Sequence, residues 1–154
     1  MPTPALIVRQ EGNNAHTHPF VSVYEAYKKS GPNVLGVEAL QGDDGSTGVK
    51  VNTADGYADY LFTATDMQAH HPSKRVSFCG RLGLIREKEG QIQLMYLGCG
   101  RSLKKGNFVL ESDHDVYAAI YMQHGVWYYS ATGPVRVKIG KETKKLNEGY
   151  NQKL

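Results

Sequence analysis

The chain has 154 residues, of which 40% are hydrophobic and 21% are charged, so it is long enough to bury one hydrophobic core and shows no compositional sign of global disorder. Its formal net charge of +3 is small, which argues against nucleic acid as a partner, and no apolar run approaches the roughly 20 residues of a membrane span. The 17 glycines and 10 tyrosines favour turns and strands, and therefore an all-β domain.

The first part of the chain reads as strands separated by polar or glycine-containing turns. Residues 20–27 carry β-branched and aromatic side chains on both parities, which predicts a central strand covered on both faces. Glu25 interrupts one of these faces and is expected near a sheet end or beside a hydrogen-bonding partner. Asp55-Gly56 separates two alternating runs and predicts a hairpin, because both residues tolerate positive φ. The expected strands are 5–9, 20–27, 34–41, 49–52 and 57–64.

The second part contains the strongest hairpin of the sequence. Two alternating runs, 76–84 and 92–96, flank the turn Lys88-Glu89-Gly90. Residues 98–106 contain glycine and lysine and are expected to form a loop. In the segment 135–139 the valines and isoleucine face one way and the basic residues face the other. The other expected strands are 107–111, 116–122 and 126–129, with turns at Gln123-His124-Gly125 and Thr132-Gly133-Pro134.

These segments give about ten strands at spacings of roughly eight to twelve residues, which is typical of a sandwich or barrel. We therefore expect a single all-β, antiparallel β-sandwich over residues 1–140 and a polar C-terminal tail over 141–154 that frays. Cys79 and Cys99 are too few for a disulfide scaffold and are expected to be two buried thiols, with a disulfide as the alternative in an oxidising compartment. The first residues lack the basic and apolar regions of a signal peptide, which fits a cytosolic protein or a signal that lies elsewhere.

Four short segments follow one another in a characteristic order. They read PFVSVYEAYK at 19–28, a valine strand leading through Asp-Gly to DYL at 49–61, FCGRLGLIR at 78–86 and YLGCG at 96–100. In this order they resemble the C-terminal β region of the heparinase II/III-like polysaccharide lyases. The resemblance covers most of residues 16–139, although Ala26 replaces the family's usual proline and His18-Pro19 replaces its threonine pair.

The resemblance implies a lyase that cleaves uronic-acid polysaccharides by β-elimination, with a helical toroid supplying much of the active site. This chain resembles the β-sandwich end of such an enzyme without its catalytic half, so the missing catalytic domain and an acidic polysaccharide are the implied partners. A periplasmic or secreted setting is also implied. If such a domain is missing, an exposed apolar patch should mark the surface where it docks.

No catalytic residue, metal site or cofactor is expected within the chain itself. His16, His18, Tyr24 and Tyr27 have the chemistry of a base and an acid, but the two tyrosines have opposite parity and leave opposite faces of one strand. The Asp113-His114-Asp115 run lacks the ligand spacing of a structural zinc site. A P-loop and a nucleophile elbow are both missing from the sequence.

Sugar binding is the more plausible chemistry. Trp127 and Tyr129 share one face of their strand and would form a flat platform for a pyranose ring if exposed, whereas packing in the core is the commoner role. Arg81 and Arg86, together with Lys104 and Lys105, are candidate partners for a sugar carboxylate or sulfate, the alternative being a solvated charged face. The predicted function is a non-catalytic C-terminal domain that supports a lyase and contacts glycan, and the alternative is an independent carbohydrate-binding module.

Overall fold

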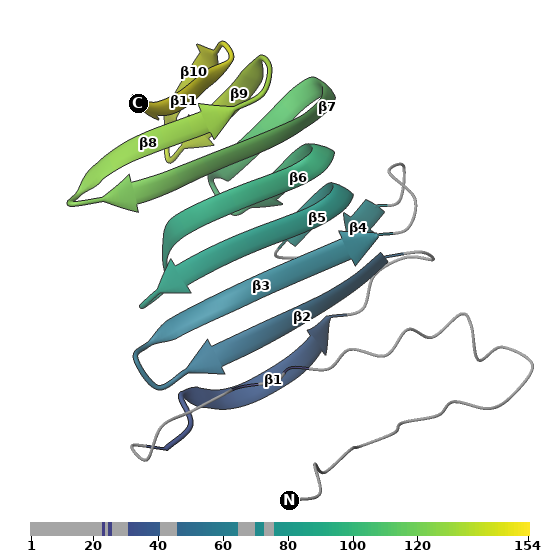
Figure 1. Ribbon diagram of the computed structural model, residues 1–154, viewed down its shortest axis with the longest axis vertical. Helices are drawn as coiled ribbons and strands as arrows, with labels where there is room; N and C mark the ends of the chain where they lie inside the picture. The colour runs from purple at the N-terminus through teal and green to yellow at the C-terminus, as the bar shows by residue number, and fades with distance from the viewer. Residues whose placement is uncertain (1–22, 24, 26–30, 41–45, 65–69, 73–75) are drawn as a thin grey trace, which may run out of the picture.

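The computed structural model describes residues 23, 25, 31–40, 46–64, 70–72 and 76–154. These residues form eleven strands in one antiparallel sheet (Figure 1), which confirms the all-β prediction of about ten strands. The strands are β1 Val34–Leu40, β2 Ser46–Thr53, β3 Tyr57–Ala64, β4 His70–Pro72, β5 Val76–Lys88, β6 Gln91–Lys105, β7 Phe108–Gln123, β8 Val126–Ala131, β9 Val135–Ile139, β10 Glu142–Leu146 and β11 Gly149–Lys153. Within these ranges, no helix has the length and apolar character needed to cross a membrane.

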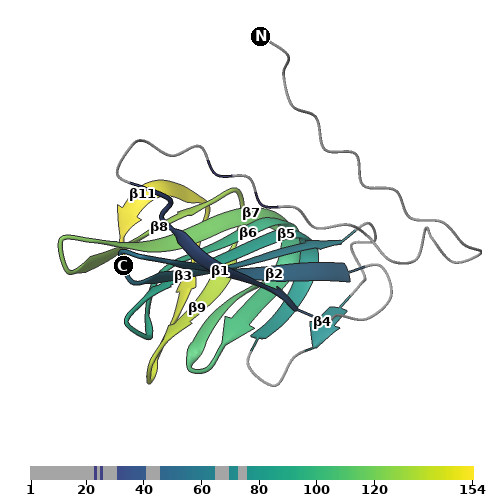
Figure 2. The ribbon, with the colours of Figure 1, turned by 90° about the horizontal axis from the view of Figure 1, so that it is seen from below.

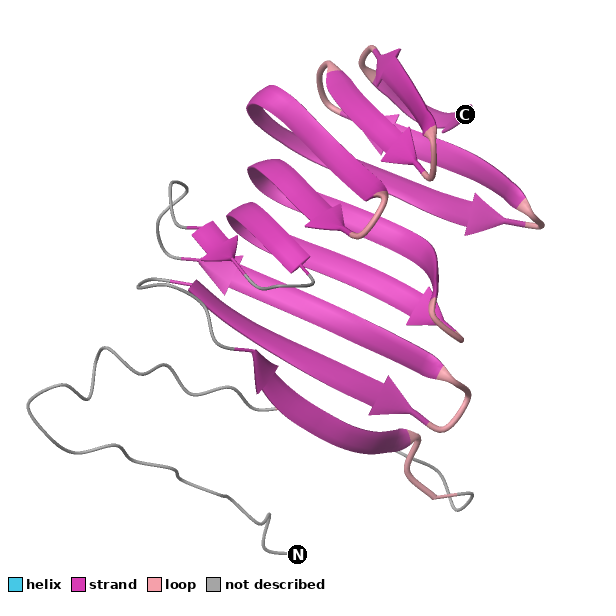
Figure 3. Cartoon of the chain, turned by 180° about the vertical axis from the view of Figure 1, so that it is seen from behind, coloured by secondary structure: helices cyan, strands magenta, loops and turns pink. Residues whose placement is uncertain are grey.

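The sheet bends over itself to make the two layers of a sandwich. Three long strands, β5, β6 and β7, run through both layers, as Figures 2 and 3 show. The start of β5 pairs with β4 and its end with β3, while the start of β7 pairs with β9 and its end with β8. The first layer therefore has the order β1-β2-β3-β5-β6-β7-β8-β11, and the second contains β4, β9 and β10 with the other halves of the long strands.

The bend is built from glycines at positions where two backbones nearly touch. A Cβ atom on Gly100 would lie 2.7 Å from the carbonyl oxygen of Cys79 and 2.8 Å from the Cα of Gly80. The pairing of β5 with β6 shifts register at Cys79/Gly80, as β-bulges do where a strand changes direction. The prediction of a loop at 98–106 is therefore wrong, because these residues carry β6 through the bend into the second layer.

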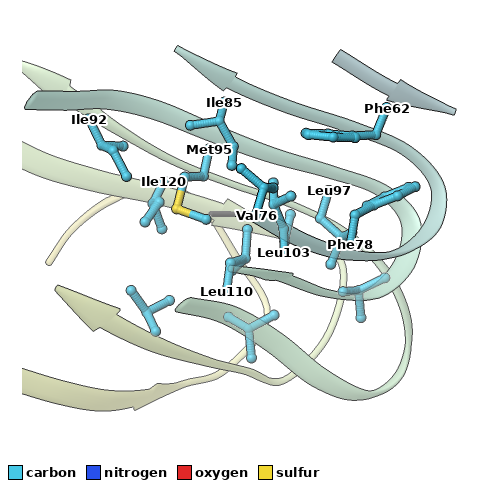
Figure 4. Close-up of a cluster of buried hydrophobic side chains, with 14 of the residues drawn as sticks. Phe62, Val76, Phe78, Ile85, Ile92, Met95, Leu97, Leu103, Leu110 and Ile120 are labelled. Carbon is cyan, nitrogen blue, oxygen red and sulfur yellow. The ribbon is translucent and has the colours of Figure 1, made fainter. Parts of the chain in front are cut away.

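The core fills the space between the two layers (Figure 4). Phe62 of the first layer stacks on Phe78 of the second, with ring centroids 5.7 Å apart. Alternating side chains along the strands are buried, as the sequence pattern predicts. The fully buried side chains are Phe62, Phe78, Ile85, Met95, Leu97, Leu103, Leu110 and Ile120.

The predicted hairpin turns are confirmed. Glu89 and Gly90, which join β5 to β6, both have positive φ, at 51° and 78°. His124 and Gly125 do the same between β7 and β8, at 51° and 77°. Two successive positive φ angles are typical of the tight turn that matches the twist of a hairpin.

The C-terminal residues differ from the predicted fraying tail. Residues 142–146 and 149–153 form β10 and β11, which pair with β9 and β8. Leu146 and Leu154 pack against the core, and the backbone N–H of Leu154 donates to the carbonyl of Trp127 at 2.9 Å. The sequence does not predict these strands, because they are polar. Backbone hydrogen bonds to β9 and β8, and not an apolar face, stabilise most of their length.

Other predictions have mixed outcomes. The expected strands at 5–9 and 20–27 lie outside the described residues except for Val23 and Glu25. Glu25 has the expected partners, since its carboxylate accepts hydrogen bonds from the backbone N–H groups of Asn33 at 2.6 Å and Val34 at 3.1 Å. Cys79 is a buried thiol, as expected, whereas the thiol of Cys99 is only partly buried, and the two do not form a disulfide with each other.

Candidate functional site

The predicted aromatic platform faces the inside of the sandwich. Trp127 and Tyr129 are half-buried and pack against the core, and the Trp127 ring lies 5.8 Å from the ring of Phe108. Trp127 also lines a cavity of about 260 Å³ at one end of the sandwich, together with Ile139 and Leu154. The two rings do not form an open flat surface, and their contact with sugar stays a prediction.

The predicted arginines lie elsewhere. Arg86 on β5 points outward from the first layer, where its Nε and Nη2 atoms each donate to a carboxylate oxygen of Asp59 at 2.7 Å. This bidentate bond raises the pKa of Arg86 and holds its guanidinium 5.3 Å from the ring centre of Tyr57. Arg81 is exposed near the bend. The structure therefore does not bring Arg86 together with Trp127 and Tyr129 on one surface, and the glycan role of both arginines stays a prediction.

The two lysines named with these arginines also have separate environments. Lys105 points into the sandwich, where its Nζ lies 2.7 Å from Glu87 Oε2 and 3.3 Å from the ring centre of Tyr60. Lys104 points outward from the second layer and pairs with Glu111 at 2.8 Å. Of these two cations, only Lys104 lies on a surface that a polymer can reach.

The outer surface of the second layer is basic. The register pairs Glu111 of β7 with Arg136 of β9, and Arg136 with Lys145 of β10, so these side chains share a face. Val109 of β7 pairs with Lys104 of β6 on one side and with Lys138 of β9 on the other, so these two lysines share the same face. We call the four outward cations Lys104, Arg136, Lys138 and Lys145 the basic face. The alternating pattern of 135–139 predicts that Arg136 and Lys138 face outward together. The sequence does not show that Lys104 and Lys145 lie beside them, because this depends on the register of strands far apart in the chain.

A groove of about 640 Å³ adjoins the basic face, and two of the four cations line it. Arg136, Lys145 and Glu111 line it, and so does Arg101, whose Nε donates to Asp115 Oδ1 at 2.9 Å. Glu111 contacts both Lys104 and Arg136. Partial burial alone would raise the pKa of Glu111, but the two cations outweigh it and lower that pKa below its ordinary value. Glu111 is therefore an anion at neutral pH that fixes the two cations in place.

The outer surface of the first layer carries exposed apolar side chains beside the Arg86–Asp59 pair. Val37 is 51% exposed, Leu61 37%, Leu82 44%, Tyr117 54% and Tyr150 84%. We call these five residues the apolar face. Their strands, β1, β3, β5, β7 and β11, run from one edge of the first layer to the other. An exposed apolar patch is expected where another domain docks, and these side chains are among the exposed apolar residues of the described chain from which one would be built.

The comparisons with known proteins agree with a lyase origin. The family model of the endo-acting ulvan lyase C-terminal domain matches residues 34–122. The chain belongs to this family. An endo-acting ulvan lyase from Formosa agariphila is 34% identical over 118 residues, which are 73% of this chain and 14% of that relative. No solved structure matches the chain.

The match confirms the coarser part of the predicted resemblance, a C-terminal domain of a polysaccharide lyase. Residues 34–122 run from the start of β1 nearly to the end of β7, so they contain four of the five residues of the apolar face. Three of the four cations of the basic face lie beyond them. The chain spans about a seventh of the length of the curated relative.

Among the residues that the structure describes, no three His, Cys, Asp or Glu side chains come together in a way that would hold a metal ion. Asp113, His114 and Asp115 are exposed on β7, and Asp115 is bound to Arg101. The residues considered for acid and base chemistry, His16, His18, Tyr24 and Tyr27, lie outside the described residues.

Proposed function

We propose that this chain is the non-catalytic C-terminal β-sandwich domain of a polysaccharide lyase and that its apolar face packs against the rest of that enzyme. The observation that carries the proposal is the position of the exposed apolar side chains, which lie across the full width of one layer. Eight strands about 4.8 Å apart make this layer about 34 Å wide, which is ample for an interface of standard size.

The residues of the family resemblance support the fold of such a domain and not a reaction. Asp59, from the Asp-Tyr pair, holds Arg86, from the end of the glycine-arginine segment, in a bidentate ion pair. Gly80, from the same segment as Arg86, and Gly100, from the segment 96–100, meet at the bend. These contacts fix the sandwich. The order of the sequence motifs is what supports the heparinase II/III-like branch, with an acidic, uronic-acid polysaccharide as the substrate of the whole enzyme. A periplasmic or secreted location belongs to the same proposal.

The experiment is a chimera in which this chain replaces the matched segment of the Formosa agariphila lyase. We expect the chimera to release unsaturated product, measured by absorbance, and the isolated chain to release none. Leu61→Lys combined with Leu82→Lys should reduce the activity and thermal stability of the chimera, because both charges would be buried at the interface.

The matched control is Lys138→Ala combined with Lys145→Ala on the opposite surface, which should leave the stability of the chimera unchanged. Circular dichroism of the isolated variants checks that both retain their strands. Product from the isolated chain would refute the non-catalytic role. Equal stability of the chimera with and without the two apolar-face substitutions would refute docking through this face.

The second candidate is an independent carbohydrate-binding module. A groove of about 680 Å³ on the outer surface of the first layer favours it, because the rings of Tyr96, Tyr117 and Tyr150 line this groove. Affinity electrophoresis in neutral polysaccharides separates the two readings. A module predicts retardation that Tyr117→Ala abolishes, whereas a docking face predicts no retardation.

A further inference from the structure

We infer that the basic face binds the anionic groups of an acidic polysaccharide. The inference rests on the proposed function, since a domain of a lyase that acts on such a polymer would meet it at high local concentration. Of its four cations, only Lys104 is among the residues that the sequence analysis names as partners of a sugar carboxylate or sulfate.

The geometry places the cations on one surface. Side chains alternate between the two faces of β9. Val135 and Val137 point inward and are only 4% and 2% exposed, so Arg136 and Lys138 both point outward. Lys145 stands directly opposite Arg136 on the neighbouring strand β10. Adjacent strands are about 4.8 Å apart, so the cations form a regular array and not a scattered set.

The charge balance of this surface is positive. Lys104, Arg136, Lys138 and Lys145 face two carboxylates in and beside the groove, Glu111 and Asp113, which leaves a formal excess of two positive charges. Arg101 and Asp115 neutralise each other at its border. Since the whole chain has a net charge of +3, most of its formal excess is on this one surface.

The groove adds the shape and the neutral polar groups that a sugar needs. Its volume of about 640 Å³ lies within the usual range for ligand pockets, and Ser102 and Asn147 bring a hydroxyl and an amide to its wall. Glu111 holds Arg136 in one orientation, so that the planar guanidinium can present paired N–H donors to a carboxylate or sulfate.

The basic face and the apolar face lie on opposite sides of the sandwich. The apolar face belongs to the outer surface of the first layer, and the basic face to the outer surface of the second. A domain docked through its apolar face would therefore still present its basic face to solvent. The two interactions can occur together.

The test compares two charge-matched double variants of the full chain in affinity electrophoresis. Arg136→Gln with Lys145→Gln removes two cations from the basic face, whereas Lys88→Gln with Lys153→Gln removes two from outside it. The gels contain a sulfated polysaccharide, a polysaccharide with carboxylates only, or a neutral dextran. We expect the basic-face variant to lose about tenfold in affinity for the polymer that binds, and the control to stay within about twofold.

The arms of the test separate the sources of the anionic group. Retardation in one or both anionic gels, but not in dextran, supports the inference and identifies sulfate or carboxylate as the ligand group. Binding should weaken steeply as added salt shortens the Debye length from about 30 Å to about 3 Å. Equal loss in both variants, retardation in dextran, or equally tight binding of single-stranded DNA would overturn it.

The inference and the proposed function can fail separately. Leu61→Lys with Leu82→Lys should leave polysaccharide binding unchanged, because these residues lie on the other surface. A chain that binds polysaccharide but fails in the chimera would overturn docking alone. A chain that is active in the chimera but shows no polysaccharide binding would overturn the basic-face site alone.

Discussion

The ion pair between Lys105 and Glu87 closes one end of the sandwich, and its removal should cost more than the loss of a surface pair. Lys105 Nζ lies 2.7 Å from Glu87 Oε2, and both side chains are only 13% exposed. The ammonium group also lies 3.3 Å from the centre of the Tyr60 ring. Because Glu87 belongs to the first layer and Lys105 to the second, the pair joins the two layers.

The size of the destabilisation depends on the Glu87 carboxylate, which Lys105→Met would leave buried without its cation. Removal of one partner of a buried pair costs about 3–5 kcal/mol, whereas an exposed pair contributes less than about 1 kcal/mol. At 13% exposure the pair lies near the buried limit, so Lys105→Met should lower the free energy of unfolding by about 2–4 kcal/mol. In a chain of this size that corresponds to roughly 4–16 °C in Tm.

The assay is urea unfolding followed by Trp127 fluorescence, for both single variants and the double variant Lys105→Met with Glu87→Gln. The double variant removes both charges, so it should recover at least half of the loss seen in Lys105→Met. A loss below about 0.5 kcal/mol in Lys105→Met would refute the reasoning, since it would mean that the pair behaves as a surface pair. Strict additivity of the two single variants would refute the coupling between them.

Three further predictions concern the bend, the core and the acid limit of stability. Gly100→Ala should lower the free energy of unfolding by about 3 kcal/mol or prevent folding, because the added Cβ would lie 2.7 Å from a carbonyl oxygen. Gly36→Ala is the control: it has open space around it and should change that free energy by less than about 1 kcal/mol, with both variants measured by urea unfolding. Phe62→Ala should cost about 3–5 kcal/mol in the same assay and Thr63→Ala, on the exposed side of the strand, less than about 1 kcal/mol. Partial burial raises the pKa of Glu111, but its two ion pairs outweigh this and hold the folded-state pKa below the ordinary value of 4.5. The ionised Glu111 therefore stabilises the fold above about pH 4.5, and this stabilisation is lost as the pH falls through the folded-state pKa. Glu111→Gln should therefore flatten the decline of stability with falling pH, and identical pH profiles for the variant and the parent chain would contradict this.

Local signals predicted the hairpins well. The alternation in β5 and the start of β6, with Glu89 and Gly90 between them, contains both the side-chain period and the turn geometry within a few residues. The Asp55-Gly56 turn between β2 and β3 is another case, and Gly56 has a φ of 83°. Where two alternating runs flank a clear turn signal, the sequence is a sufficient guide.

The bend and the C-terminal strands needed information that local patterns lack. Glycine marks a loop as often as a close approach of two backbones, and the contact of Gly100 with Gly80 joins positions 20 residues apart. β10 is polar along most of its length, so no apolar period announces it. The long strands β5 to β7 change layers partway, and a residue pattern read strand by strand does not show which layer receives each half.

The candidate surfaces were only partly predictable. Trp127 and Tyr129 were correctly placed on one face, but whether that face was the inside or the outside depended on the other layer. Arg86 was predicted to contact a sugar carboxylate or sulfate. The structure pairs it with Asp59 of the neighbouring strand, and its glycan role remains a prediction. The basic face combines residues from β6, β9 and β10, and the strand register alone assembles it.

Hydrogen–deuterium exchange of the chimera, compared with the isolated chain, tests the central claim most directly. If the chain docks through its apolar face, amides of β1 and β3 should exchange more slowly in the chimera, while amides of β9 and β10 should exchange at the same rate in both. Unchanged exchange in β1 and β3 would contradict docking through the apolar face. Slower exchange confined to β9 and β10 would contradict both the docking face and the free basic face.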